Sequence, residues 1–313
     1  MKKLLILAAL LLTAISCGTH SKKSEMKTLV LYYSQNGATR AVAQEIASRL
    51  GDGATLAEIV PENPYDGDFH ATIERGKKEL DEGVLPGIKP LDVDLSAYDV
   101  IFLGYPIWFG TYAPPVSTLL ASGALNSKKI VPFCTFGSGG LQSSVRNLAK
   151  ALPDAEILPG YGVRQARLAA MPAEVDRFLK EGGFIAGEVT PLEDFSDSHT
   201  VREEETAIFN AAVGDYPMIH AMALYAASRK VPGGVEYCFT AIDMPRDGKP
   251  EKLTGISPKQ PGFSARKAPG LPDPSEDKPV PGNTKVPGRL NGQMSVYVLV
   301  EDGQSPVFTE VVR

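Results

Sequence analysis

The sequence predicts an α/β domain built on an open parallel sheet, followed by a smaller α+β unit. Three observations support this. Between residues 28 and 187, short apolar runs alternate with segments of helical periodicity. Several of these apolar runs end directly in loops rich in glycine, small polar or aromatic residues. From residue 188 onward, one helical segment precedes several runs that read as strands, which is typical of an α+β layout.

The first unit contains five predicted strands and five predicted helices in alternation. In open parallel sheets, ligands bind beyond the carboxyl ends of the strands, near the point where the strand order reverses. Three such loops carry residues suited to a ligand, namely those after the first, third and fourth strands. The predicted strands are 29–33, 55–60, 100–103, 129–135 and 156–163, and the predicted helices are 40–50, 69–82, 115–122, 141–152 and 172–181.

The first of these loops, residues 34–39, joins a strand to a helix through small and polar residues. A helix N-terminus offers free N–H groups and the positive end of the helix dipole, and both favour phosphate. The hydroxyls of Ser34 and Thr39 are further candidate donors. The loop holds no lysine, which argues against a nucleotide-hydrolysing P-loop and suits a single phosphate monoester. An ordinary turn without a ligand is the alternative interpretation.

The second and third loops offer groups that suit a flat heterocycle. The second loop, residues 105–112, carries Trp108 and Phe109, whose rings can stack on such a ligand. Pro106 and Gly110 beside the single tryptophan favour an exposed loop over a core position. The third loop, residues 135–140, offers glycine N–H groups that can hydrogen-bond a ring edge.

With these three loops in this order, residues 26 to about 183 resemble the flavodoxin family, most closely its members with a Gly-Tyr-Pro-Ile-Trp-aromatic-Gly loop. The resemblance implies a sheet of order 2-1-3-4-5, FMN as the cofactor, and no catalytic side chain. It also suggests that a backbone group near Gly110 contacts flavin N5. The residues it assigns are Ser34, Gln35, Asn36, Gly37, Ala38 and Thr39 for the phosphate, Pro106, Ile107, Trp108, Phe109 and Gly110 for the isoalloxazine, and Phe136, Gly137, Ser138 and Gly139 for the third flavin loop.

The second unit, residues 188–313, is similar to cystatin-like domains. A capping box at residues 200–203 is predicted to open a helix that runs to residue 213. In that family a Gln-x-Val-x-Gly hairpin enters a protease cleft. Val231 and Gly233 match this pattern, whereas Arg229 replaces the glutamine. Residues 245–292, rich in proline and glycine, are predicted to form a mobile loop. The predicted strands are 219–230, 235–241, 294–301 and 307–312.

The N-terminus is typical of a bacterial lipoprotein. Two lysines precede an apolar run at residues 4–12 that is too short to span a bilayer. Residues 14–17 then resemble a lipoprotein cleavage box, with Cys17 as the lipidated residue and residues 18–25 as a tether. The predicted location is the cell envelope, outside the cytoplasm, with a lipid anchor in the membrane. An ordinary secretory signal is the alternative.

Charge and residue spacing argue against two other classes of function, nucleic-acid binding and metal binding. The net charge of -5 and the lack of a basic stripe argue against nucleic-acid binding. Cys134, Cys238 and the four histidines show no metal-ligand spacing, so no metal site is predicted. The predicted function is an FMN-binding redox protein. It either transfers electrons to a partner protein or reduces a quinone-like molecule with NAD(P)H or another donor. The alternative is a partner- or protease-binding protein with a vestigial flavin site.

Overall fold

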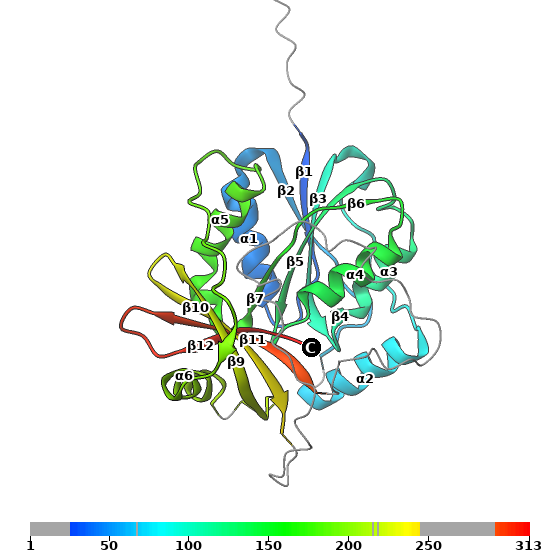
Figure 1. Cartoon of the computed structure of the whole chain (residues 1–313). Helices are drawn as coiled ribbons and strands as arrows, with labels where there is room; N and C mark the ends of the chain where they lie inside the picture. The colour runs from blue at the N-terminus through cyan, green and yellow to red at the C-terminus, as the bar shows by residue number, and fades with distance from the viewer. Residues whose placement is uncertain (1–25, 67, 215, 218, 245–291) are drawn as a thin grey trace, which may run out of the picture.

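The computed structural model describes residues 26–66, 68–214, 216–217, 219–244 and 292–313. Figure 1 shows a parallel sheet with helices on both faces and a smaller antiparallel sheet beside it. The predicted lipidation site Cys17, the tether, and residues 245–291 of the predicted mobile loop lie outside the described residues. None of the helices in the described ranges has both the length and the apolar character needed to cross a bilayer.

The strands of the large sheet follow the order β2-β1-β3-β5-β6, and β7 pairs in parallel with the end of β5. This confirms the predicted order 2-1-3-4-5. The predicted fifth strand is divided into β6 and β7, because Pro159 lacks the N–H that a ladder needs. The strands are β1 (Thr28–Tyr32), β2 (Ala54–Glu58), β3 (Val100–Trp108), β5 (Lys129–Phe136), β6 (Glu156–Ile157) and β7 (Tyr161–Arg164).

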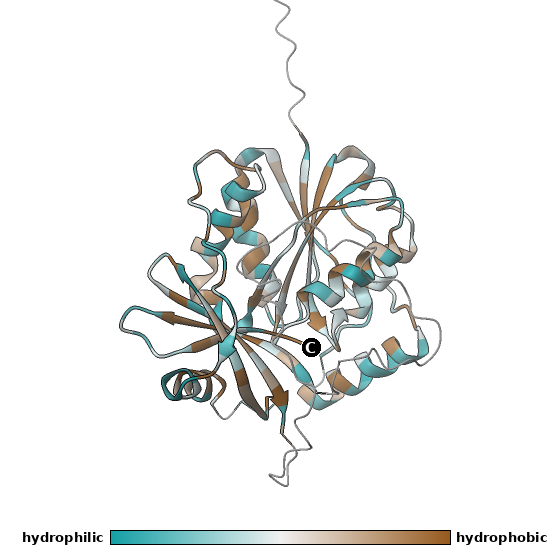
Figure 2. Cartoon of the chain, viewed as in Figure 1, coloured by the Kyte–Doolittle hydropathy of each residue, from teal (hydrophilic) through white to brown (hydrophobic). Residues whose placement is uncertain are grey.

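Helices cover both faces of this sheet, because alternate strand residues point to opposite sides. Leu29 and Leu31 pack in the cluster that includes α3 (Pro114–Ala121) and α4 (Leu141–Ala151). Val30 packs on the other face, in the cluster that includes α1 (Ala38–Leu50) and α5 (Met171–Glu181). Figure 2 shows the hydrophobic colour concentrated on the strands between these layers. The remaining helix, α2 (Phe69–Glu82), lies beside α3 at the carboxyl edge of the sheet.

The antiparallel sheet has the strand order β12-β11-β10-β9-β8. One helix, α6 (Glu203–Val213), packs on it through Phe209, whose ring centroid lies 5.3 Å from that of Phe239. The four predicted strands are present, and a short strand not predicted from the sequence, β8, is added at one edge. The strands are β8 (His199–Thr200), β9 (Ala221–Val231), β10 (Gly234–Asp243), β11 (Gln293–Glu301) and β12 (Val307–Val312).

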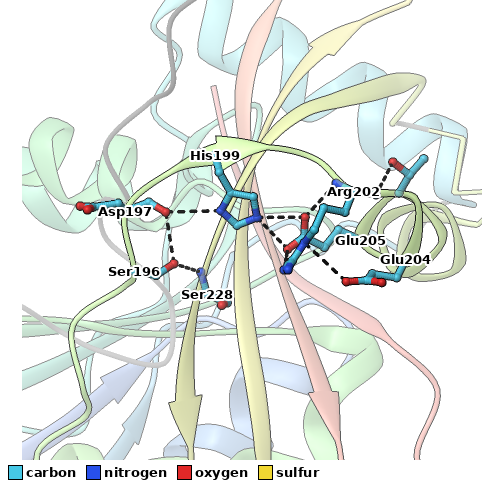
Figure 3. A network of polar contacts seen from close by, with 8 residues as sticks. Ser196, Asp197, His199, Arg202, Glu204, Glu205 and Ser228 are labelled. Carbon is cyan, nitrogen blue, oxygen red and sulfur yellow. Dashed lines mark hydrogen bonds and ion pairs between the residues drawn. The ribbon is translucent and has the colours of Figure 1, made fainter.

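The N-terminus of α6 differs from the predicted capping box. Thr200 belongs to β8 and pairs with Tyr225, so it is not the helix cap. The N-cap is Arg202, whose backbone N–H donates to Glu205 Oε2 over 2.9 Å. The same buried carboxylate accepts from the Arg202 guanidinium and lies 3.0 Å from His199 Nε2 (Figure 3). Burial raises the pKa of Glu205, but these hydrogen bonds outweigh it and lower the pKa to about 2.

Candidate functional site

The loop before α1 has the geometry of an anion-binding helix N-terminus. Gly37 is the N-cap residue at φ 88°, a conformation that glycine adopts without a steric penalty. A Cβ at Gly37 would meet no atom within 4 Å, so open space lies beside the first turn. Ser34 Oγ accepts from the N–H groups of Gly37 and Arg40 over 3.1 and 3.2 Å. The hydroxyl thereby caps the helix and keeps its own proton for a ligand.

The other side chains of this loop fix its shape. Gln35 donates to the Tyr65 carbonyl over 2.5 Å and accepts from the Tyr33 hydroxyl over 2.6 Å. Asn36 Oδ1 accepts from the Ala38 N–H, and Asn36 Nδ2 donates to Gln165 Oε1 over 3.0 Å. The polar side chains at positions 35 and 36 therefore hold the backbone in place.

The Thr39 hydroxyl, expected at the phosphate, contacts a second buried hydroxyl. Thr39 is 1% exposed, and its Oγ1 lies 2.8 Å from Oγ1 of Thr135 at the end of β5. The buried Thr39 hydroxyl is therefore held against Thr135, and either hydroxyl can be the donor in this bond. In the first helical turn, the backbone N–H of Thr39 has no intrahelical acceptor.

The aromatic segment is a β-hairpin, not the loop that the sequence predicts. Strand β3 continues to Trp108, and β4 (Thr111–Tyr112) pairs back onto it. Phe109 and Gly110 form the two-residue turn, with φ values of 52° and 80°. Two positive φ angles at the centre of a two-residue hairpin are characteristic of a type I′ turn. The hairpin presents Phe109, which is 48% exposed, at its tip.

Trp108 is half-buried, whereas the sequence predicts an exposed ring. Its indole meets Tyr33 and Tyr65 edge-on, with ring centroids 6.1 and 5.1 Å away. On another side it packs against Gly76 of α2, where an added Cβ would lie 2.9 Å from the ring. Glycine at position 76 therefore allows α2 to support the indole. Phe109 is the ring that remains exposed for stacking.

Sequence reasoning missed the residues that hold this aromatic wall. The Tyr65 hydroxyl donates to the buried carboxylate of Glu79 in α2. Arg75 donates to Glu79 Oε1 over 2.8 Å, and its guanidinium lies 3.9 Å above the Tyr65 ring. Burial, together with the hydrogen bond to Glu79, raises the pKa of Tyr65, so the ring stays neutral at physiological pH. The charged pattern of α2 gave no signal of this role, because it suggests a solvated helix.

The third loop lies directly beside the hairpin. Phe136, at the end of β5, is buried, while Ser138 and Gly139 are partly exposed. The Cβ position of Gly140 is 2.8 Å from Ile107, and Ser143 Oγ donates to the Gly110 carbonyl over 2.6 Å. Pro106, next to Ile107 in β3, pairs with Thr135 of β5. Together with the Thr39–Thr135 contact, these contacts bring the three predicted loops together at one edge of the sheet.

The antiparallel sheet contacts the opposite side of the third loop. The N–H of Val311 in β12 donates to the Ser138 carbonyl over 2.6 Å. Arg164, at the end of β7, donates to the carbonyls of Gly137 and Phe308, each over 2.8 Å. Its guanidinium also lies 3.3 Å from the centre of the Phe308 ring. Burial lowers the pKa of Arg164 to about 10, which leaves the side chain charged at neutral pH.

The β9–β10 hairpin, which the cystatin resemblance places in a protease cleft, folds back against α5. Val231 is buried and, with Pro232, lines a cavity of about 430 Å³ whose other wall includes Arg177 of α5. Arg229, at the position of the family's glutamine, forms a buried ion pair with Glu236. This arrangement does not favour insertion of the hairpin into another protein.

Cysteine and metal chemistry find no support in the described ranges. Cys134 and Cys238 are buried and form no disulfide, as the sequence predicts. Burial and the nearby charge of Glu310 raise the pKa of Cys134, which disfavours the reactive thiolate. Among residues that the structure describes, no group of three or more His, Cys, Asp or Glu side chains could hold a metal ion.

Comparison with known proteins finds similarity over about half of the chain. Similar structures include a candidate flavoprotein from Bacteroides eggerthii (28% identity, covering 48% of this chain and 98% of that protein, TM-score 0.41). A second is a flavoprotein from Lactobacillus acidophilus in complex with FMN (28% identity, covering 47% of this chain and 99% of that protein, TM-score 0.40). A third is a candidate flavoprotein from Bacteroides uniformis (27% identity, covering 48% of this chain and 98% of that protein, TM-score 0.43). No protein in the curated set matches this chain. Residues 27–171, which contain all three loops, match the family model described as flavodoxin.

Proposed function

We propose that the parallel-sheet domain binds FMN and that the protein is an FMN-dependent redox protein. The observation that carries this proposal is the meeting of three complementary surfaces. The open N-terminus of α1 suits a phosphate, the exposed ring of Phe109 suits a flat heterocycle, and the third loop suits a ring edge. The family match over residues 27–171 supports the same cofactor.

The chain's own residues bind and orient the cofactor. The Ser34 hydroxyl and the Thr39 N–H would hold the phosphate, where the helix dipole favours negative charge. The N–H groups of Gly37, Ala38 and Arg40 already donate to Ser34 and Asn36, and these bonds shape the loop around that position. The hairpin tip at Phe109 and Gly110 and the third loop would hold the isoalloxazine. The flavin itself supplies the electron-transfer chemistry, and the surrounding dipoles set its reduction potential. No side chain is needed as a nucleophile or a general base.

Flavin binding is tested by incubating the protein, produced from residue 18 onward, with FMN and passing it through gel filtration. We expect a retained flavin absorbance band. Ser34→Ala should weaken binding of FMN but leave riboflavin unaffected, because riboflavin lacks the phosphate. Thr206→Ala, which alters a hydroxyl on α6 far from the loops, is the control. A folded wild-type protein that retains no flavin contradicts the proposal.

The same site could serve as an electron carrier or as a reductase of quinone-like molecules. A carrier oxidises NAD(P)H slowly with or without a quinone, whereas a reductase oxidises it quickly once a quinone is added. An extracytoplasmic site would favour a membrane or protein donor over NAD(P)H. Stopped-flow measurement of flavin reduction by each donor distinguishes the two.

We also propose that a lipid on Cys17 anchors the protein outside the cytoplasm. The basis is the leader pattern in residues 1–17. Cys17→Ser should move the protein from the membrane fraction to the soluble fraction after cell lysis, with no change in flavin content. If the cysteine variant stays in the membrane fraction, lipid attachment at Cys17 is wrong.

A further inference from the structure

The third loop is held between two parts of the molecule. Gly140 faces the aromatic hairpin through Ile107, as described above. Gly139 faces β12 so closely that an added Cβ would lie 2.2 Å from the Val311 carbonyl oxygen. The Cβ position of Gly137 is 2.9 Å from the Tyr216 hydroxyl. Residues of the antiparallel domain therefore form one wall of this loop.

One hydrogen bond from this wall and one from Arg164 of β7 fix two consecutive peptide groups. Arg164 Nε donates to the Gly137 carbonyl, and the Val311 N–H donates to the Ser138 carbonyl. The described residues contain no cis peptide, and in a trans peptide the C=O and N–H groups point in opposite directions. The N–H groups of Ser138 and Gly139 are therefore turned away from Arg164 and β12.

Arg164 ties the wall and the loop into one unit. It donates to a carbonyl on each side, Gly137 in the loop and Phe308 in β12, and it stacks on the Phe308 ring. Arg164 is 6% exposed, so water competes little for these bonds. A change in the position of β12 is thereby transmitted to the loop.

We propose that the C-terminal antiparallel domain is part of the flavin-ring site: Val311 of β12, together with Arg164 of β7, which is bound to Phe308 of β12, holds the third loop with the Ser138 and Gly139 N–H groups directed at the polar edge of the bound ring. The inference rests on the proposed function. Arg164 and Val311 are positioning residues, because they act through the loop. Two donors at the ring edge favour the negative charge that reduction places there, so the same contacts raise the reduction potential.

The test replaces the N–H of Val311 in the full chain. Val311→Pro removes this donor, and β12 is the last strand of its sheet among the described residues, so the lost N–H is not one that pairs with β11. Val311→Ala keeps the N–H and shortens the same buried side chain, which makes it the matched control. Circular dichroism establishes that both variants fold.

Relative to Val311→Ala, we expect Val311→Pro to raise the dissociation constants of FMN and riboflavin about tenfold and by the same factor. The reduction potential should fall. FMN should also protect the Ser138 and Gly139 amides from hydrogen exchange in Val311→Ala but less in Val311→Pro. If Val311→Pro does not fold, Gly139→Ala tests the same contact, with Gly53→Ala, at an open position, as its control.

The outcomes separate the two proposals. If the wild-type protein binds neither flavin, the proposed function fails and this inference fails with it. If the wild type binds FMN but the proline and alanine variants have equal affinities and potentials, only the inference is wrong. Tighter flavin binding by Val311→Pro would also overturn it, because β12 would then obstruct the site.

Discussion

The hydroxyls of Thr39 and Thr135 lie 2.8 Å apart in the core and join the start of α1 to the end of β5. Each is the other's partner, so the two loops that follow β1 and β5 share one buried hydrogen bond. This contact fixes the position of Thr39 relative to the loop that follows β5.

Because Thr39 and Thr135 share a buried hydrogen bond, the effects of replacing each one on the free energy of unfolding should not add. Thr39→Val leaves the Thr135 hydroxyl buried without this partner, which costs about 1–3 kcal/mol of unfolding free energy. The double variant Thr39→Val/Thr135→Val removes both polar groups and should be less destabilised than the sum of the two single changes. Urea unfolding of the four proteins measures this coupling. A coupling near zero would contradict the buried bond, and a phosphate role for the hydroxyl would appear as weaker FMN binding in Thr39→Val.

Replacing Gly76 with alanine is expected to lower the stability of the protein, although this replacement is normally stabilising inside a helix. In a helix interior, Gly→Ala stabilises by about 1 kcal/mol. Here the new Cβ would lie 2.9 Å from the Trp108 ring, so we expect Gly76→Ala to destabilise the protein by about 1–2 kcal/mol instead. Trp108 is the single tryptophan, and its emission should shift as the ring moves. Gly53→Ala is the control. Equal stability of the two variants would show that the Trp108 ring moves aside without an energetic cost.

Replacing Phe109 with asparagine should stabilise the protein but weaken its binding of flavin. Its φ of 52° is strained for a phenylalanine, whereas Asn-Gly is favoured in a type I′ turn. Phe109→Asn should therefore raise the unfolding free energy by about 0.5–1 kcal/mol. It also removes the exposed ring, so flavin affinity should fall. Phe69→Ala, which deletes an exposed ring on α2, is the control for aromatic loss. Unchanged flavin affinity in Phe109→Asn would remove Phe109 from the site.

The low pKa of Glu205 implies that the antiparallel domain loses folding stability at acidic pH. Its pKa is about 2 in the folded protein, below its ordinary value of 4.5, so the unfolded chain binds its proton more readily. The stabilisation from Arg202 and His199 is complete above about pH 4.5 and is lost as the pH falls toward 2. Glu205→Gln should lower stability at pH 7 and flatten this dependence between pH 5 and 2. Glu204→Gln, at an exposed carboxylate, should behave as the wild type.

The site could be located from the sequence, but its contacts could not. The carboxyl-end loops at residues 34–39, 105–112 and 135–140 follow from the alternation of apolar runs and helical segments, and they meet as predicted. Strand length was less well predicted, because Pro106 suggests a loop although β3 continues through it. The sequence also predicts the wrong N-cap for α6. Thr200 has a side chain suited to a cap, but it pairs with β9 as part of β8, and the N-cap is Arg202.

The strand order of the parallel sheet was implied by the resemblance to the flavodoxin family. The sequence by itself determined the parallel sheet, the second sheet and the positions of the three loops. These depend on local periodicity and on chain rules that apply to any α/β domain. Only the tertiary structure decided that Thr39 is held against Thr135, that α2 supports Trp108, and that β12 holds the third loop. Each of these contacts joins residues far apart in the chain. Their proximity arises from packing of complete elements, which local patterns do not encode.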